Sequence, residues 1–484
     1  MKKTVPTTFY LLLVLFLGLS VQSQSKKWTL EACVDYALKN NISIKQTDLD
    51  VKSAAIDKNS ALGAFLPSIN ASTNHSWNIG LNTNVITNAL ENQTTQNTSV
   101  SLSSGITIYN GLQNQNRLRR TNLALVATQY QLSKMKDDIG LNVANAFLQI
   151  LFNKENLNVQ NAQLANTEKQ LIRSTALVEA GSVPRGDLLD IKATLAATKQ
   201  NVVVAENNLY LSKLSLAQLL QLEDFQNFDV DDTVPEVKGS GTMLENPVTI
   251  YKKAKEERIE LKIAKTNLLL AEKDVLIARG ALLPKLSGFY SFSTRAGYSD
   301  RIVGYAQNAA NPYSASPSYV DVNGTPYSVM QPNYAPILGK AAPVFSQFSD
   351  YKGHSFGLQL NVPILNGFSA KNNVARYKIA LDRSKIALKQ SELDLERNVY
   401  TAYTNAKGAF NAYESAKVTL EAREEAFKYA KEKYAVGLMN SFDFNQSQTL
   451  FVNAQSEVLR TKYDYIFKVK IVELYFGIPI IKKQ

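Results

Sequence analysis

Residues 61–67 read ALGAFLP and residues 278–284 read ARGALLP, so the second stretch repeats the first at an offset of 284 − 67 = 217. Residues 109–111 read YNG and return as LNG at residues 365–367, at an offset of 367 − 111 = 256. An internal repeat has to be recognised before a fold is assigned. Each unit is far longer than a solenoid repeat, so we interpret it as half of the molecule. The second offset exceeds the first by 256 − 217 = 39, which places one insertion between the matched stretches of the second half.

The repeat divides the chain into two similar halves. The second offset also aligns Gly181 with Gly437 and Asp187 with Asp443. An acidic stretch that contains proline and glycine lies between the halves, and this composition is typical of a linker. We therefore expect three segments in the mature chain: a first repeat at 24–222, a linker at 223–244 and a second repeat at 245–484.

Residues 1–23 have the composition of a secretory signal peptide. Two lysines precede an apolar run from Phe9 to Leu19, and small residues follow it. We expect cleavage after Ser23, so that the mature chain leaves the cytoplasm. An uncleaved membrane anchor is the alternative, but the run is shorter than the ~20 residues that a spanning helix needs.

The composition argues against several classes of function. The formal net charge is +11, yet basic and acidic residues are interleaved as on any solvated helix face, so we expect no nucleic-acid partner. The sequence holds two histidines and a single cysteine, Cys33, which cannot form an intrachain disulfide. It contains no phosphate-binding loop and no metal-ligand spacing. We therefore expect no enzyme activity, no catalytic residue, no cofactor and no metal site.

Four segments alternate between apolar and polar residues with the period of a β-strand. Their ranges are 68–79, 99–108, 285–295 and 355–364. Each is about as long as the ~9–11 residues that a tilted strand needs to cross a bilayer. The polar positions are mainly serine and asparagine, with few charges. The pattern favours strands with one face towards lipid, and a soluble antiparallel sheet, half buried and half wet, is the alternative.

Four strands cannot close a barrel by themselves. An open strand edge in lipid leaves N–H and C=O groups without partners, which hydrocarbon does not tolerate. Several chains must therefore contribute to one barrel. We expect the strands as hairpins at about 67–109 and about 284–366. The second hairpin carries the insertion, which has almost no helical period, and we expect it to be a long loop at 297–353.

Helices surround each hairpin. Residues 112–178 contain no proline and one glycine, so they can form one helix of ~100 Å. Apolar residues recur every seven positions from Val143 onwards, and again from Val399, which indicates coiled-coil packing. An ordinary exposed helical hairpin is the alternative. A shorter helix opens each half, at 28–66 and 245–283, and ends at a Leu-Pro junction because proline stops it.

The long helices turn at a glycine, Gly181 in the first half and Gly437 in the second. Glycine fits the left-handed cap at the C-terminus of a helix. Asp187 and Asp443 follow six residues later, where an acidic side chain in the first turn of a helix favours the helix dipole. Capping alone could explain these residues, so a functional role stays open at this point.

The order of these elements resembles that of the TolC-like outer-membrane efflux proteins: a signal peptide, then a helix, a hairpin and a long helical hairpin, all of which occur twice. The resemblance extends from Trp28 to Pro479. The residues that carry it are the Leu-Pro junctions at Pro67 and Pro284, the strand end VPILNG at 362–367 with its counterpart YNG at 109–111, and the tip sequences YAVGL at 434–438 and SFD at 441–443.

The resemblance implies a mainly α protein with β structure. In this fold class, a trimer forms one twelve-strand outer-membrane β-barrel, with four strands per chain, and a long α-helical tunnel continues it into the periplasm. The resemblance also implies three kinds of partner: outer-membrane lipid, a periplasmic adaptor (membrane fusion) protein and an inner-membrane pump. The expected function is a passive exit duct for small molecules in tripartite efflux or type I secretion.

The resemblance also assigns roles to the helical tips. We expect the adaptor to contact the residues around both turns: Ala180, Gly181, Ser182, Val436, Gly437 and Leu438. We expect four residues at the periplasmic aperture: Asp187, Asp190, Asp443 and Tyr434. Gln446 stands where the second half would match Asp190. We further expect a hydrogen bond from Tyr434 to Asp187 on the neighbouring hairpin, which would hold the resting aperture shut.

A structural protein is the alternative from another class. It would be a secreted coiled-coil scaffold or adhesin that uses its two β-hairpins to dock onto a partner. The channel would be a detergent-extracted trimer of the outer membrane that extends into the periplasm, whereas the scaffold would be a soluble elongated monomer.

Overall fold

The computed structural model describes residues 27–84, 88–223, 225–233 and 245–478. The expected signal peptide at 1–23 and residues 234–244 of the expected linker lie outside the described residues. The chain divides into two units, which we call the helical unit and the strand unit. Within the described ranges, the helical unit comprises 27–56, 122–271 and 380–478, and the strand unit comprises 57–121 and 272–379.

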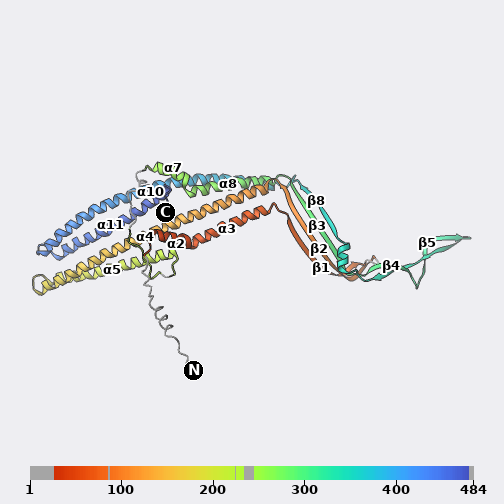
Figure 1. Ribbon diagram of the computed structural model, residues 1–484, viewed down its shortest axis with the longest axis horizontal. Helices are drawn as coiled ribbons and strands as arrows, with labels where there is room; N and C mark the ends of the chain where they lie inside the picture. The colour runs from red at the N-terminus through yellow and green to blue at the C-terminus, as the bar shows by residue number, and fades with distance from the viewer. Residues whose placement is uncertain (1–26, 85–87, 224, 234–244, 479–484) are drawn as a thin grey trace, which may run out of the picture. The chain divides into compact units, whose positions relative to one another are not determined.

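The strand unit contains a four-stranded antiparallel sheet (Figure 1). Its order is β1-β2-β3-β8, where β1 spans Ser68–Thr83, β2 Leu90–Asn110, β3 Lys285–Gly297 and β8 Gly353–Asn361. Because β2 belongs to the first repeat and β3 to the second, the two repeats join in the middle of one sheet. The strands β1 and β8 form its two edges.

The register gives the sheet one apolar and one polar face. Leu102 of β2 lies opposite Phe292 of β3, and Ser101 lies opposite Ser293. Directly opposite residues of antiparallel strands share a face, so apolar side chains meet apolar ones across the sheet. The apolar face is open in the single chain, where Phe356 of β8 is 80% exposed. A sheet that folded in water would bury such a face against a core.

The stretch 297–353, for which the sequence predicts a long loop, is regular structure instead. Its elements are β4 (Arg301–Gln307) paired with β7 (Tyr334–Gly339), β5 (Tyr313–Val322) paired with β6 (Thr325–Pro332), and the helix α9 (Val344–Asp350). Asn323 and Gly324 join β5 to β6 with φ of 56° and 87°. Two positive φ angles at Asn-Gly are typical of a type I′ hairpin turn, and tyrosine and valine favour the flanking strands. The missing helical period therefore indicates strands here.

Each repeat opens with two helices where the sequence predicts one. The elements are α2 (Leu30–Asn40) and α3 (Ile42–Gly63) in the first repeat, and α7 (Pro247–Glu257) and α8 (Ile259–Gly280) in the second. The breaks at Asn41 and Arg258 fall at one repeat position, because 258 − 41 equals the first offset, 217. Asn41 has ψ 130°, and its Oδ1 accepts from the N–H of Ser43 at 2.9 Å. Such a local bond competes with helix continuation.

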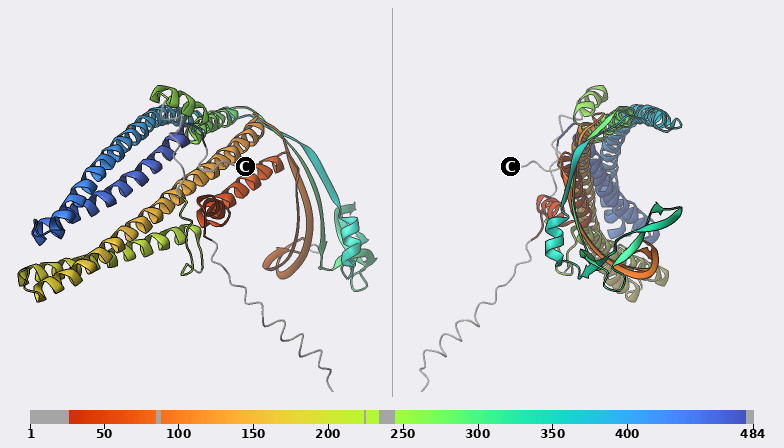
Figure 2. Two further views of the ribbon diagram at one scale, coloured as in Figure 1. Left: turned by 60° about the vertical axis from the view of Figure 1, so that its left-hand side comes forward. Right: turned by 90° about the vertical axis from the view of Figure 1, so that its right-hand side faces the viewer.

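The long helices form two helical hairpins (Figure 2). The first consists of α4 (Gln113–Glu179) and α5 (Arg185–Leu220), and the second of α10 (Ser369–Ala435) and α11 (Ser441–Tyr475). Heptad positions such as Val143, Ile150 and Ala406 are buried, as coiled-coil packing requires. A core around Phe147 joins α2, α4 and α5 in the helical unit. Of the helices in the described ranges, none combines the length and the hydropathy of a membrane-spanning helix.

Candidate functional site

Both helical hairpins turn at a glycine in the left-handed conformation. Gly181 has φ 71° and Gly437 has φ 79°. In each turn the next residue donates its N–H to the carbonyl oxygen five residues earlier, at 2.8 Å for Ser182 and 2.9 Å for Leu438. These bonds close a Schellman motif, for which glycine is the preferred residue. All six residues expected at the tips are exposed, including the apolar side chains of Val436 and Leu438.

The expected aperture carboxylates differ in their surroundings. Asn440 caps α11, because its Oδ1 accepts from the N–H of Asp443 at 2.8 Å and its Nδ2 donates to the Asp443 carboxylate at 3.0 Å. In α5, Pro184 occupies the cap position and supplies no side-chain bond. Asp187 lies half-buried in the first turn of α5, and Asp190 is exposed one turn later. Capping therefore engages Asp443 more than it engages the other two.

Tyr434 makes contacts that the sequence did not predict. Its ring stacks on Phe444, with centroids 4.5 Å apart. Its hydroxyl lies 3.4 Å from Oγ of Ser174, so within one chain it does not form the expected bond to Asp187. Arg173 donates to the carbonyl oxygen of Ala435 at 2.9 Å. The first and second repeats are thus linked just before the tips.

Arg173 and Ser174 therefore adjoin the expected aperture residue Tyr434, and neither was predicted from the sequence. Both lie on α4, whereas Tyr434 lies on α10. The pairing depends on which faces of two hairpins meet in space. A heptad pattern identifies the buried face of each helix, but it does not say which polar residue lies opposite which.

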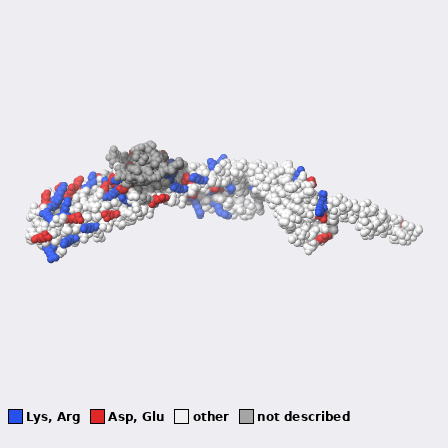
Figure 3. All heavy atoms as spheres, turned by 60° about the horizontal axis from the view of Figure 1, so that its bottom comes forward, with Lys and Arg blue, Asp and Glu red and all other residues white. Residues whose placement is uncertain are grey.

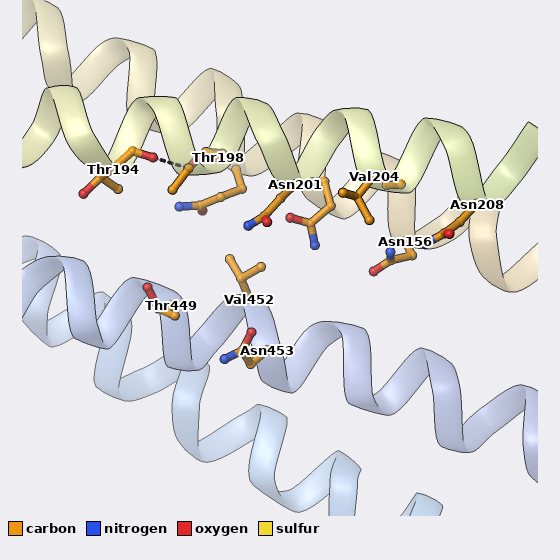
Figure 4. Close-up of a pocket in the computed structure, with 13 residues that line it drawn as sticks. Asn156, Thr194, Thr198, Asn201, Val204, Asn208, Thr449, Val452 and Asn453 are labelled. Carbon is orange, nitrogen blue, oxygen red and sulfur yellow. Dashed lines mark hydrogen bonds between the residues drawn. The ribbon is translucent and has the colours of Figure 1, made fainter.

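A polar seam joins the two hairpins of the helical unit. Gln448 of α11 is only 1% exposed, and its Nε2 donates to Oε1 of Gln163 at 3.1 Å. Its Oε1 accepts from Nε2 of Gln170 at 3.2 Å. Beside these residues, a groove of about 500 Å³ lies between α4, α5 and α11, and Asn201 and Asn453 point into it (Figure 4). Hydrogen bonds of this kind can be exchanged for bonds to water at small net cost.

Ion pairs hold the segment that follows α5. Lys154 lies 2.8 Å from Asp229 and 2.9 Å from Asp232, and Lys213 lies 2.9 Å from Asp229. Burial acts to raise the pKa of Asp229, but hydrogen bonds from Lys154 and Lys213 outweigh it and leave that pKa lowered. The described end of the expected linker is thereby fixed against α4.

Charged side chains are unevenly distributed between the elements. On the face drawn in Figure 3, both signs gather over the helices and few charges lie over the sheet. The edge strands β1 and β8 contain no lysine, arginine, aspartate or glutamate. Such strands suit a medium in which an unpaired charge is costly. Among the described residues, no group of three or more His, Cys, Asp or Glu side chains could hold a metal ion.

A sequence model of the family described as outer membrane efflux protein matches residues 33–221 and 250–469. The match includes both repeats. The chain belongs to the outer membrane efflux protein family. It is accordingly an outer-membrane protein that extends into the periplasm and serves as an exit duct for efflux or secretion.

Curated relatives of this outer membrane efflux protein include two TolC proteins. Outer membrane protein TolC of Vibrio cholerae is 23% identical over 348 residues, which span 70% of this chain and 67% of that protein. TolC of Escherichia coli is 22% identical over 330 residues, which span 67% of this chain and 58% of that protein.

Solved structures show the same fold. The CmeC outer membrane channel of Campylobacter jejuni superposes with a TM-score of 0.73 at 18% identity, over 93% of this chain and 85% of that chain. The MtrE outer membrane channel of Neisseria gonorrhoeae gives a TM-score of 0.68 at 15% identity, over 93% and 88%. The family match confirms the expected family and outer-membrane location, and the solved structures confirm the expected fold of the chain.

Proposed function

We propose that three copies of the chain form one channel, with a barrel in the outer membrane and a helical tunnel in the periplasm. The sheet carries this proposal, because it has an exposed apolar face and two open edges, β1 and β8. In hydrocarbon the edges must be paired, which requires a closed barrel. In a barrel of about eight strands, the side chains fill the interior. Three copies of a four-stranded sheet provide more strands than that, so a lumen remains.

The polar face of the sheet lines this lumen. Ser72 and Ser101 lie opposite each other with their hydroxyl oxygens 2.7 Å apart, and similar short polar side chains follow along both strands. Hydroxyl and amide groups keep a pore wet without blocking it. Transport through such a lumen is passive. Its selectivity comes from the width of the pore and the groups that line it. A channel of this kind needs no catalytic residue.

The tips are the proposed docking site for a periplasmic adaptor, which connects the channel to an inner-membrane pump. The apolar side chains of Val436 and Leu438 are exposed on a tight turn, where a partner surface can cover them. A Cβ atom added to Gly181 or Gly437 would meet none of the described residues within 4 Å, so the backbone there is open to close approach. Ala180 and Ser182 complete the equivalent surface of the first repeat.

The periplasmic aperture is the proposed site of Asp187, Asp190, Asp443 and Tyr434. In three copies each carboxylate occurs three times around the axis, so the narrow end concentrates cations and disfavours anions.

Reconstitution tests the proposed function. We expect the full-length protein to fractionate with the outer membrane, to require detergent for extraction and to form cation-selective pores in planar bilayers. A soluble monomer without conductance would instead support the scaffold. For the adaptor, a photocrosslinker at Leu438 should link to a co-expressed adaptor, whereas one at Ile386, an exposed residue of α10, should not.

A further inference from the structure

Two glycines touch where the repeats meet in the strand unit. Gly111 follows β2, and Gly280 ends α8 shortly before β3. A Cβ atom on Gly280 would lie 2.5 Å from the carbonyl oxygen of Gly111, and one on Gly111 would collide with the carbonyl oxygen of Gly280. The contact therefore requires glycine on both sides. At Gly111 the φ of 66° also favours glycine.

An ion pair joins the same two repeats. Nε of Arg120, on α4, lies 2.5 Å from Oδ1 of Asp274, on α8. Both side chains are partly shielded from water. The centre of the chain thus combines a strand ladder between β2 and β3, a glycine contact and an ion pair.

The internal repeat gives each of these four residues a counterpart of the same type. The second offset, 256, applies to Gly111 and Arg120, and the first offset, 217, applies to Gly280 and Asp274. Gly111 and Arg120 thus correspond to Gly367 and Arg376. Gly280 and Asp274 correspond to Gly63 and Asp57.

These counterparts lie at the open edges and lack the contacts seen at the centre. Gly63 precedes β1, and Gly367 follows β8. Within the described ranges of the chain, a Cβ atom added to either glycine would meet nothing within 4 Å. Asp57 and Arg376 are exposed and take part in no ion pair within the described chain. Each edge of the sheet therefore carries one half of an arrangement that is complete in the middle.

We propose that β8 of one copy pairs with β1 of the next copy in the same register as β2 with β3. Arg376 of one copy then binds Asp57 of the next, and Gly367 packs against Gly63. The partner at each edge is a second copy of this chain, and three such boundaries close the ring. This interface rests on the proposed trimeric channel and specifies how its copies join.

The offsets fix the register of the new ladder. Within the chain, Ser101 lies opposite Ser293. The second offset leads from Ser101 to Gly357 (101 + 256 = 357), and the first leads from Ser293 back to Ser76 (293 − 217 = 76). Gly357 of one copy should therefore lie opposite Ser76 of the next. All further pairs along the two strands follow from this one.

The faces of the two strands match in this register. Phe356 falls opposite Trp77, and Leu358 falls opposite His75, so the apolar face continues across the boundary. Phe356 and Trp77 are 80% and 60% exposed in the single chain. A slip of one residue would place Phe356 opposite a serine or an asparagine and would turn one of the two strands inside out.

Charge reversal tests the ion pair. Asp57→Arg and Arg376→Asp each create like-charge contacts at three boundaries, and we expect each to lower the fraction of SDS-resistant trimer about tenfold. The double variant restores opposite charges and should recover the wild-type fraction. Reversal of Asp382 and Lys385, an exposed pair on α10, is the matched control and should change nothing. A double variant as deficient as the single variants would overturn the pairing.

Disulfide formation tests the register, in a Cys33→Ala background. Asn74→Cys with Gln359→Cys, which fall opposite each other in this register, should give a covalent trimer on a non-reducing gel, because opposite residues lie within disulfide reach. Ser76→Cys with Phe356→Cys, which place their side chains on different faces, should not. Links only in the second variant would overturn the register. If the wild type is a trimer but the first double-cysteine variant forms no link, this interface alone is refuted. If the wild type is a monomer, the proposed function is refuted as well.

Discussion

The guanidinium of Arg173 lies over the ring of Tyr434, 6.0 Å from its centroid. The same group donates to the carbonyl oxygen of Ala435 at 2.9 Å. One side chain of the first repeat thus holds the last turn of α10 in the second repeat. Because both residues lie next to the proposed aperture, this contact ties the two hairpins together at the point where they would have to separate.

Removal of this contact should open the aperture. Arg173→Ala removes a solvent-exposed hydrogen bond worth about 0.5–1.5 kcal/mol, so we expect a higher single-channel conductance in planar bilayers. Tyr434→Phe removes only a hydroxyl 3.4 Å from its partner and should raise conductance less. Unchanged conductance in Arg173→Ala would contradict this role. An equal rise in Tyr434→Phe would favour a bond from Tyr434 to a carboxylate of another copy, such as Asp187.

The aperture carboxylates should set ion preference. We expect Asp187→Asn and Asp190→Asn each to reduce the cation selectivity measured as a reversal potential across a KCl gradient, because each removes three negative charges from the proposed trimer. Asp443→Asn, which changes the equivalent carboxylate of the second repeat, should reduce the selectivity as well. Asp382→Asn, on the exposed face of α10, serves as the control. Reversal potentials equal to wild type in the first two variants would rule out this assignment.

Gly63 should tolerate a side chain in the monomer but not in the trimer. An added Cβ meets nothing within 4 Å in the described part of one chain, whereas in the proposed interface it meets the backbone near Gly367. We expect Gly63→Ala to keep the helical circular dichroism of the wild type and to destabilise each boundary by about 1–3 kcal/mol. Sedimentation in detergent should then show dissociation. Gly408→Ala, equally unobstructed within the chain, is the control, and a stable Gly63→Ala trimer would argue against the contact.

The ion pairs at Asp229 predict loss of stability in acid. The folded-state pKa of Asp229 is lowered, so its contribution is present above the unfolded value of about 3.9 and is lost as the pH falls through the folded pKa. We expect Lys154→Met to lower the free energy of unfolding by about 1 kcal/mol at pH 7 and to reduce the acid dependence. Denaturation followed by the fluorescence of Trp28, in a Trp77→Phe background, measures both. Lys199→Met, at an exposed position of α5, should match wild type; equal pH profiles for all three proteins would contradict the assignment.

The main elements could be predicted because their signals are local. Alternation with period two marks the membrane-facing strands, and the heptad pattern with few breaks marks the long helices. The Asn323-Gly324 turn was also visible in the sequence, since Asn-Gly between β-favouring residues signals a hairpin. The expectation of a long loop was wrong because the absence of a helical period does not distinguish a loop from a strand.

Other features depend on contacts that a sequence does not display. The break at Asn41 is stabilised by a bond from its Nδ2 to the carbonyl oxygen of Leu219, which is distant in the chain. The partners of Tyr434 likewise depend on which helix faces meet.

The most direct test of the central claim is the mass of the particle extracted from the outer membrane, measured by sedimentation with the bound detergent subtracted. We predict three chains per particle and precipitation once the detergent is removed. A single chain that stays monodisperse in detergent-free buffer would contradict a barrel shared between copies.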